Sequence, residues 1–202
     1  MNNQPFDMEN FLRCANWNIL LNLYGSAHNS IIGFLSTTWL AQSNKHFVLD
    51  TAPANQVGQR NKGKLADLLL CSDSTPIVVA EVESTVKKYN DKLKVVESYL
   101  NNQEEFSGLE FGLLLLLNWT GRKRDNYHPN WDELKASIEK TKHNIALVSF
   151  EKKATELPFN RDSHPRLMEE RGWFQWGYTS IDFWIHFNDQ QIKTDNLWRK
   201  TD

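Results

Sequence analysis

Two apolar segments in the middle of the chain carry acidic residues where apolar ones would be expected. Asp67 directly precedes the run LLLC, and Glu81 and Glu83 alternate with apolar residues in VVAEVE. Burying an unpaired carboxylate costs on the order of several kcal/mol, so a positive charge must balance these acids. A hard cation held by oxygen ligands, Mg2+ or alternatively Mn2+, would do so. The alternatives are that this face is exposed to solvent or that lysines and arginines neutralise it.

The two segments predict a β-hairpin that brings the acids together. If Cys71 pairs with Ile77 across the turn SDSTP, Asp67 lies directly opposite Glu81. Side chains opposed in this way have Cβ atoms ~4.5–5.5 Å apart, close enough to share one cation. Alternate residues of a strand share a face, so Glu83 lies ~7 Å further along on the same side. We therefore expect all three carboxylates on one face of the hairpin.

The periodicity of apolar residues predicts an α/β fold around this hairpin. Helical spacing covers residues 8–24, 85–103 and 130–143, and strand patterns cover 45–51, 64–71, 77–83, 111–118 and 144–150. The segment IIGFLSTTWLA either extends the first helix or forms a second one. The resulting order, αβββαβαβ, predicts a mixed sheet whose parallel crossovers carry helices.

The composition is that of an ordinary globular domain. The chain has 202 residues, of which 40% are hydrophobic and 24% charged. We expect one domain over 1–202, with a core at about 9–150 and an aromatic-rich C-terminal extension at 151–202. Alternation in 172–187 predicts a strand or a strand-like cover. For the tryptophans of this extension we expect core packing or an oligomer interface in preference to a platform for stacked bases.

Sequence features also indicate the compartment. The two cysteines are far apart and form neither a metal motif nor a disulfide scaffold, which favours a reducing cytoplasm. The N-terminus has no basic region, and the longest apolar run, LLLLL, is far shorter than the ~20 residues of a membrane span. We therefore expect a cytoplasmic protein without a membrane segment.

The acids and their place in the element order resemble the PD-(D/E)XK nuclease superfamily, in which an Asp is followed by a (D/E)-x-K triplet on the next strand. Asp67 matches the Asp and Glu81 the second acid, whereas Glu83 stands where Lys is usual and Ala66 replaces the Pro. Some members carry Glu at that position, and others move the Lys to the following helix, where Lys92 is the candidate. The motif similarity covers about 64–100, and the element order agrees over about 9–150.

The resemblance implies a restriction endonuclease-like core and Mg2+-dependent hydrolysis of phosphodiester bonds in DNA. Asp67 and Glu81 would then bind the metal ion, and Glu83 would orient the attacking water or hold a second ion. Lys92 would stabilise the developing negative charge. Glu9 is a further candidate ligand, although an acid near a helix N-terminus more often interacts with the helix dipole.

Basic residues near the hairpin are candidates for contacts with the DNA backbone. Arg60, Lys62 and Lys64 precede the first strand of the hairpin, and Lys88 lies on the following helix. The formal net charge of the chain is -2, so any basic surface must be local. The alternative for these side chains is a solvated surface without a partner.

Two other functions and a homodimeric assembly are open at this stage. The missing triplet lysine and the mildly acidic charge are compatible with a nuclease fold that has lost catalysis and serves as a binding or assembly module. A metal-binding enzyme that acts on a small phosphorylated substrate would need a closed pocket instead of an open groove. A homodimer that cuts both strands is also compatible with the resemblance.

Overall fold

The computed structural model describes residues 6–21, 27–50, 66–83, 88–120, 130–156, 174–188, 190–191 and 195–199. The helices are α1 (Met8–Cys14), α2 (Asn18–Leu21), α3 (Ala27–Leu40), α4 (Tyr89–Asn101) and α5 (Trp131–Glu139). The strands are β1 (His46–Asp50), β2 (Leu68–Ser72), β3 (Thr75–Glu83), β4 (Phe111–Thr120), β5 (Ile145–Glu156), β6 (Phe174–Phe187), β7 (Gln190–Gln191) and β8 (Asp195–Arg199).

All the strands belong to one mixed sheet. Its order is β1-β2-β3-β4-β5-β6-β7, and β8 also pairs with β6. The central strands β3, β4 and β5 are parallel, whereas the pairs β1–β2, β2–β3 and β5–β6 are antiparallel. The predicted α/β class and mixed sheet are therefore confirmed.

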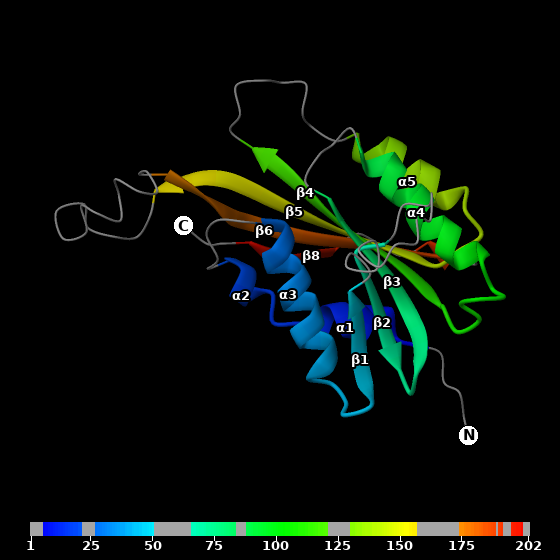
Figure 1. The fold of residues 1–202 in the computed structure, drawn as a ribbon. Helices are drawn as coiled ribbons and strands as arrows, with labels where there is room; N and C mark the ends of the chain where they lie inside the picture. The colour runs from blue at the N-terminus through cyan, green and yellow to red at the C-terminus, as the bar shows by residue number, and fades with distance from the viewer. Residues whose placement is uncertain are drawn as a thin grey trace, which may run out of the picture.

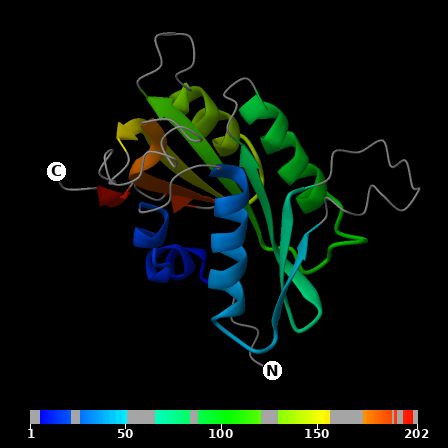
Figure 2. The ribbon, with the colours of Figure 1, turned by 60° about the vertical axis from the view of Figure 1, so that its left-hand side comes forward.

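Helices cover both faces of the sheet, as Figures 1 and 2 show. Helices α1 to α3 lie on one side, and α4 and α5 lie on the other. Successive residues of each strand alternate between two cores: Val78, Ala80 and Val82 pack with α1–α3, whereas Val79 packs with α4. This alternation follows from the period of two in a β-strand.

Strand β4 is central, as its continuous apolar run predicts. Leu113 to Leu117 are all fully buried and contribute alternately to the two cores. Helix α4 approaches this strand closely at Gly112, where an added Cβ would lie only 2.2 Å from Cγ1 of Val96. Glycine at this position thus allows α4, which carries Lys92, to pack against the sheet.

The β2–β3 hairpin adopts the predicted register only in part. Leu68, Leu69 and Leu70 pair with Ala80, Val79 and Val78, and one further step in this register brings Asp67 level with Glu81. The expected pairing of Cys71 with Ile77 is wrong, because Cys71 pairs with Pro76 instead. A β-bulge leaves Ile77 as the extra residue on β3, and such a bulge locally shifts the register.

The turn of this hairpin is shorter than expected. Ser72 pairs with Thr75, so only Asp73 and Ser74 connect the two strands, not the five residues of SDSTP. Both have positive φ angles, 47° and 69° respectively. This is the pattern of a type I′ turn, whose twist matches that of the flanking strands.

The expected helix over 8–24 is interrupted. Helix α1 ends at Cys14, Ala15 is extended (φ -64°, ψ 133°), and α2 begins at Asn18. The side chain of Trp17 explains the break, because its Nε1 donates a hydrogen bond to the carbonyl oxygen of Leu12 at 2.7 Å. The segment after it forms the separate helix α3.

The aromatic C-terminal segment completes the sheet. Strand β6 runs antiparallel to β5 over almost its whole length, which confirms the strand predicted for this segment. Ile181, Phe183 and Ile185 enter the core under α1–α3, and Trp184 enters the core under α4 and α5. Among the described residues, no helix combines the length and apolar character needed to cross a membrane.

Candidate functional site

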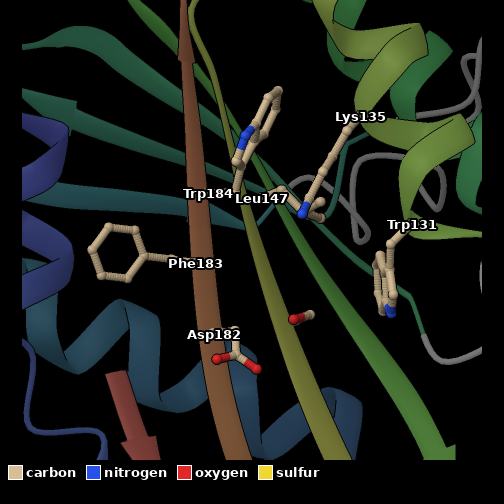
Figure 3. A pocket seen from close by; sticks show the side chains of 7 residues that line it. Trp131, Lys135, Leu147, Asp182, Phe183 and Trp184 are labelled. Carbon is tan, nitrogen blue, oxygen red and sulfur yellow. The ribbon is translucent and has the colours of Figure 1, made fainter. Parts of the chain in front are cut away.

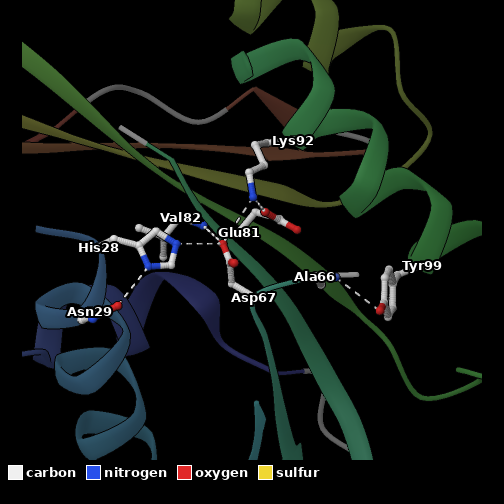
Figure 4. Close-up of polar contacts among 8 residues, drawn as sticks. All are labelled: His28, Asn29, Ala66, Asp67, Glu81, Val82, Lys92 and Tyr99. Atoms are coloured by element: carbon white, nitrogen blue, oxygen red, sulfur yellow. Dashed lines mark hydrogen bonds and ion pairs between the residues drawn. The ribbon is translucent and has the colours of Figure 1, made fainter. Parts of the chain in front are cut away.

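The predicted acids come together with a lysine at the carboxyl end of β3, where both helical layers meet the sheet (Figure 4). Asp67 lies immediately before β2, and Glu81 lies near the end of β3. From α4, the ammonium of Lys92 contacts Glu81 directly and lies 3.5 Å from Oδ2 of Asp67. In open α/β sheets, ligands typically bind at the carboxyl ends of parallel strands.

Oδ2 of Asp67 is the point at which several groups converge. It accepts a hydrogen bond from the backbone N–H of Val82 at 2.8 Å, so the side chain continues the hairpin ladder where the β2 backbone has ended. Nε2 of His28 lies 3.5 Å from the same oxygen. Burial opposes ionisation of Asp67, but hydrogen bonds from His28 and Val82 hold its pKa below the usual value. Asp67 is therefore ionised at neutral pH.

Glu81 lies opposite Asp67, and its pKa is shifted in the opposite direction. Its side chain is fully buried, and this burial raises its pKa to about 8, although the hydrogen bond with Lys92 opposes the rise. Oε1 of Glu81 is buried and has no hydrogen-bond partner in the described part of the chain. A buried carboxylate oxygen without a partner costs free energy, which marks it as a position that a proton or a cation would stabilise.

Lys92 is the lysine that the sequence analysis predicted on the helix after the hairpin. Its side chain is about one-fifth exposed, at 20%. Burial alone would lower the pKa of Lys92, but hydrogen bonding and charge interaction with Glu81 raise it above the usual value. Lys92 therefore stays charged and partly neutralises the acids. This agrees with the alternative that lysines and arginines, and not a metal ion, balance the acidic face.

His28 belongs to this site but was not recognised from the sequence. It lies in the first turn of α3, and its Nδ1 is 3.4 Å from Oδ1 of Asn29. The hydrogen bond with Asp67 raises the pKa of His28 despite partial burial. No local motif marks this histidine, because its contact depends on how α3 packs across the sheet.

Glu83 lies two residues beyond Glu81 and is largely buried. It acts on the next helix through Tyr89, whose pKa is raised by burial and then by the charge of Glu83. The hydroxyl of Tyr89 donates a hydrogen bond to the carbonyl oxygen of Leu117 on β4. The start of α4 is thus attached to the same end of the sheet as the acids.

The other predicted residues have different outcomes. Lys88 is exposed at the N-cap of α4, close in sequence to the site. Arg60, Lys62 and Lys64 lie outside the described residues. Glu9 accepts a 2.8 Å bond from Arg13 one turn further along α1, which is an ordinary helical ion pair.

Two of the acids could share a metal ion. Within the described ranges, no three His, Cys, Asp or Glu side chains are placed so as to hold one ion together. The carboxylates of Asp67 and Glu81 nevertheless supply only oxygen atoms, and Oε1 of Glu81 is buried without a partner. These features fit a hard cation, provided that the Lys92 ammonium moves away from the two acids.

The chain matches no protein-family model, no curated protein and no solved structure.

Proposed function

We propose that this protein is a metal-dependent phosphodiester hydrolase with a restriction endonuclease-like core, acting on DNA. The supporting observation is that Asp67 just before β2, Glu81 on β3 and Lys92 on α4 converge on one point at the carboxyl end of β3. An aspartate, a glutamate and a lysine in this arrangement correspond to the three roles expected from the sequence, although the lysine comes from α4.

Each side chain would have a role that fits its charge. Asp67, ionised and oriented by Val82 and His28, would hold a Mg2+ or Mn2+ ion together with Glu81. When bound, such an ion lowers the pKa of a water molecule and offsets negative charge on the phosphate. Glu83 would orient the attacking water, and the Lys92 ammonium would stabilise the charge that develops on the phosphate oxygens.

A cleavage assay tests this proposal. Supercoiled plasmid is incubated with the protein and Mg2+ or Mn2+, alongside Glu81→Ala and the control Glu104→Ala, which changes an exposed acid elsewhere. We expect Glu81→Ala to reduce the cleavage rate by about 100-fold or more and the control to leave it unchanged. Equal cleavage by all three proteins, or cleavage by none, would contradict the proposal.

A second candidate is a nuclease-like fold that binds partners without catalysis. It is favoured by the direct contact between Lys92 and Glu81, since a lysine can replace the metal ion as a permanent counterion. Calorimetric titration with Mn2+ distinguishes the two functions. Binding that disappears in Asp67→Asn supports the hydrolase, whereas the absence of binding to the wild-type protein supports the binding module.

A further inference from the structure

A separate pocket of about 300 Å³ opens on the same face of the sheet as the acids, between α5 and the strands β5 and β6 (Figure 3). This volume is at the lower end of the range for small-ligand sites, roughly 300–1,000 Å³. Charged, hydroxyl, aromatic and aliphatic side chains line the pocket, contributed by Trp131, Lys135, Leu147, Ser149, Asp182 and Trp184. Phe183 also borders the pocket, but its side chain packs in the core under α1–α3.

The strand register places this pocket in line with the acidic site. Glu83 pairs with Leu116, Leu116 with Ser149, and Ser149 with Asp182, so one row crosses four neighbouring strands. Paired residues on adjacent strands point to the same face. With ~4.8 Å between strands, Glu83 and Asp182 are separated by roughly 14 Å. A short stretch of an extended nucleic-acid strand could therefore reach from the acids to the pocket.

The charged groups of the pocket suit a ligand that carries both an anion and hydrogen-bond donors. Lys135 extends from α5 toward Leu147 (Figure 3), and no described residue forms an ion pair with its ammonium. Asp182 lies at the opposite end of the pocket and supplies acceptor oxygens. A phosphate would pair with Lys135, and ring N–H, amino or sugar hydroxyl groups would donate to Asp182.

Aromatic side chains connect the pocket with the acidic site. Trp131 stacks on Tyr89, with ring centroids 5.8 Å apart and an interplanar angle of 22°. Tyr89 in turn interacts with Glu83, so the two sites share a wall. The indole of Trp131 also lines the pocket, where it offers an apolar surface to a planar ring.

We propose that this pocket binds one unpaired nucleotide of the nucleic-acid substrate; the inference rests on the proposed function. Lys135 binds its phosphate, Trp131 contacts its base, and Asp182 accepts a hydrogen bond from the base or sugar. A base inside a duplex is paired and stacked, and so it cannot enter a pocket of this size. The preferred substrate accordingly has a single-stranded segment or a frayed end near the bond that is cut.

Binding measured without divalent ions tests the pocket separately from cleavage. A fluorescein-labelled single-stranded oligonucleotide and a blunt duplex of the same sequence are titrated with wild type, Lys135→Ala, Lys135→Arg and the control Lys142→Ala. Lys142 is an exposed lysine just beyond α5. We expect Lys135→Ala to weaken single-strand binding roughly tenfold, Lys135→Arg to retain most of it, and the control to have no effect.

The salt dependence gives a second readout. Loss of one phosphate contact should reduce the slope of log K against log salt concentration by roughly 0.7 for a single strand. Equal affinities for Lys135→Ala and Lys142→Ala would overturn the inference, as would equal weakening on single strand and duplex. Either result together with Glu81-dependent cleavage leaves the hydrolase function in place. Lys135-dependent binding without cleavage leaves the pocket in place and contradicts the hydrolase.

Discussion

At the scale of residues, the site separates two similar carboxyl groups by their surroundings. Asp67 receives hydrogen bonds and has a lowered pKa, whereas Glu81 is fully buried and has a pKa raised to about 8. Pairs of titratable groups whose environments move their pKa values apart are typical of acid–base and metal-binding sites. A metal site and a structural ion-pair network differ in that only the former binds Mn2+ in an Asp67-dependent way.

The raised pKa of Glu81 predicts a stability that falls with rising pH. The folded state retains a proton on Glu81 that the unfolded chain releases above pH 4.5, so stability decreases until pH passes about 8. The slope approaches about 1.4 kcal/mol per pH unit within this window. Urea unfolding in EDTA at several pH values measures it in wild type and Glu81→Gln. His28, which also has a raised pKa, is present in both proteins, and a pH slope that is equal in the two would contradict the prediction.

Removal of the Lys92 charge should destabilise the fold in a pH-dependent way. In Lys92→Met, we expect a loss of roughly 3–5 kcal/mol at pH 9. At this pH the ionised Glu81 of the wild type keeps its partner, whereas the variant has either to bury an unpaired carboxylate or to keep a proton on it. The loss should be smaller at pH 6, because Glu81 can then keep a proton. Lys94→Met on the exposed side of α4 is the matched control and should change stability by no more than about 0.5 kcal/mol. Equal losses at the two pH values would argue against a charged pair.

The hydrophobic pattern of the sequence predicted the strands and helices that carry the site, because their side-chain directions follow from local backbone geometry. Asp67 lies level with Glu81 as predicted, because the shorter turn and the bulge at Ile77 together restore the register that a five-residue turn would give. The position of Lys92 follows from the helical period after the strand. The bulge at Ile77 and the shorter turn could not be predicted, since the apolar pattern alone does not specify where the extra residue goes. The contact of His28 depends on the packing of α3 across the sheet, a tertiary effect with no local signal.

A substitution in the turn at Asp73 and Ser74 should stabilise the fold. Ser74 has φ 69°, a left-handed conformation that costs a residue with a side chain roughly 1–2 kcal/mol. We expect Ser74→Gly to raise the free energy of unfolding by about 0.5–1 kcal/mol, because the strain it relieves exceeds the entropy lost on ordering a glycine. Ser74→Val should instead lower it, since a β-branched residue disfavours positive φ. Thermal unfolding of the two variants measures the difference, and the opposite order would contradict a type I′ turn.

One sheet supports two cores. Leu114 and Leu116 of β4 pack under α4 and α5, while Leu113, Leu115 and Leu117 pack under α1–α3. The candidate site combines both layers, with His28 from α3 and Lys92 from α4 next to Asp67. The geometry of the site should therefore depend on both cores, including the one that lies farther from the acids.

Because the cores share every central strand, we expect them to unfold together. Leu12→Ala in the α1–α3 core and Ile138→Ala in the α4–α5 core each remove a fully buried side chain and should cost about 2–5 kcal/mol. Each variant should shift tryptophan fluorescence and far-ultraviolet circular dichroism to the same lower urea midpoint, with coincident transitions. If the central strands unfold, the side chains of both cores are exposed at once. Separate transitions in either variant would show that one helical layer detaches first and would contradict the prediction.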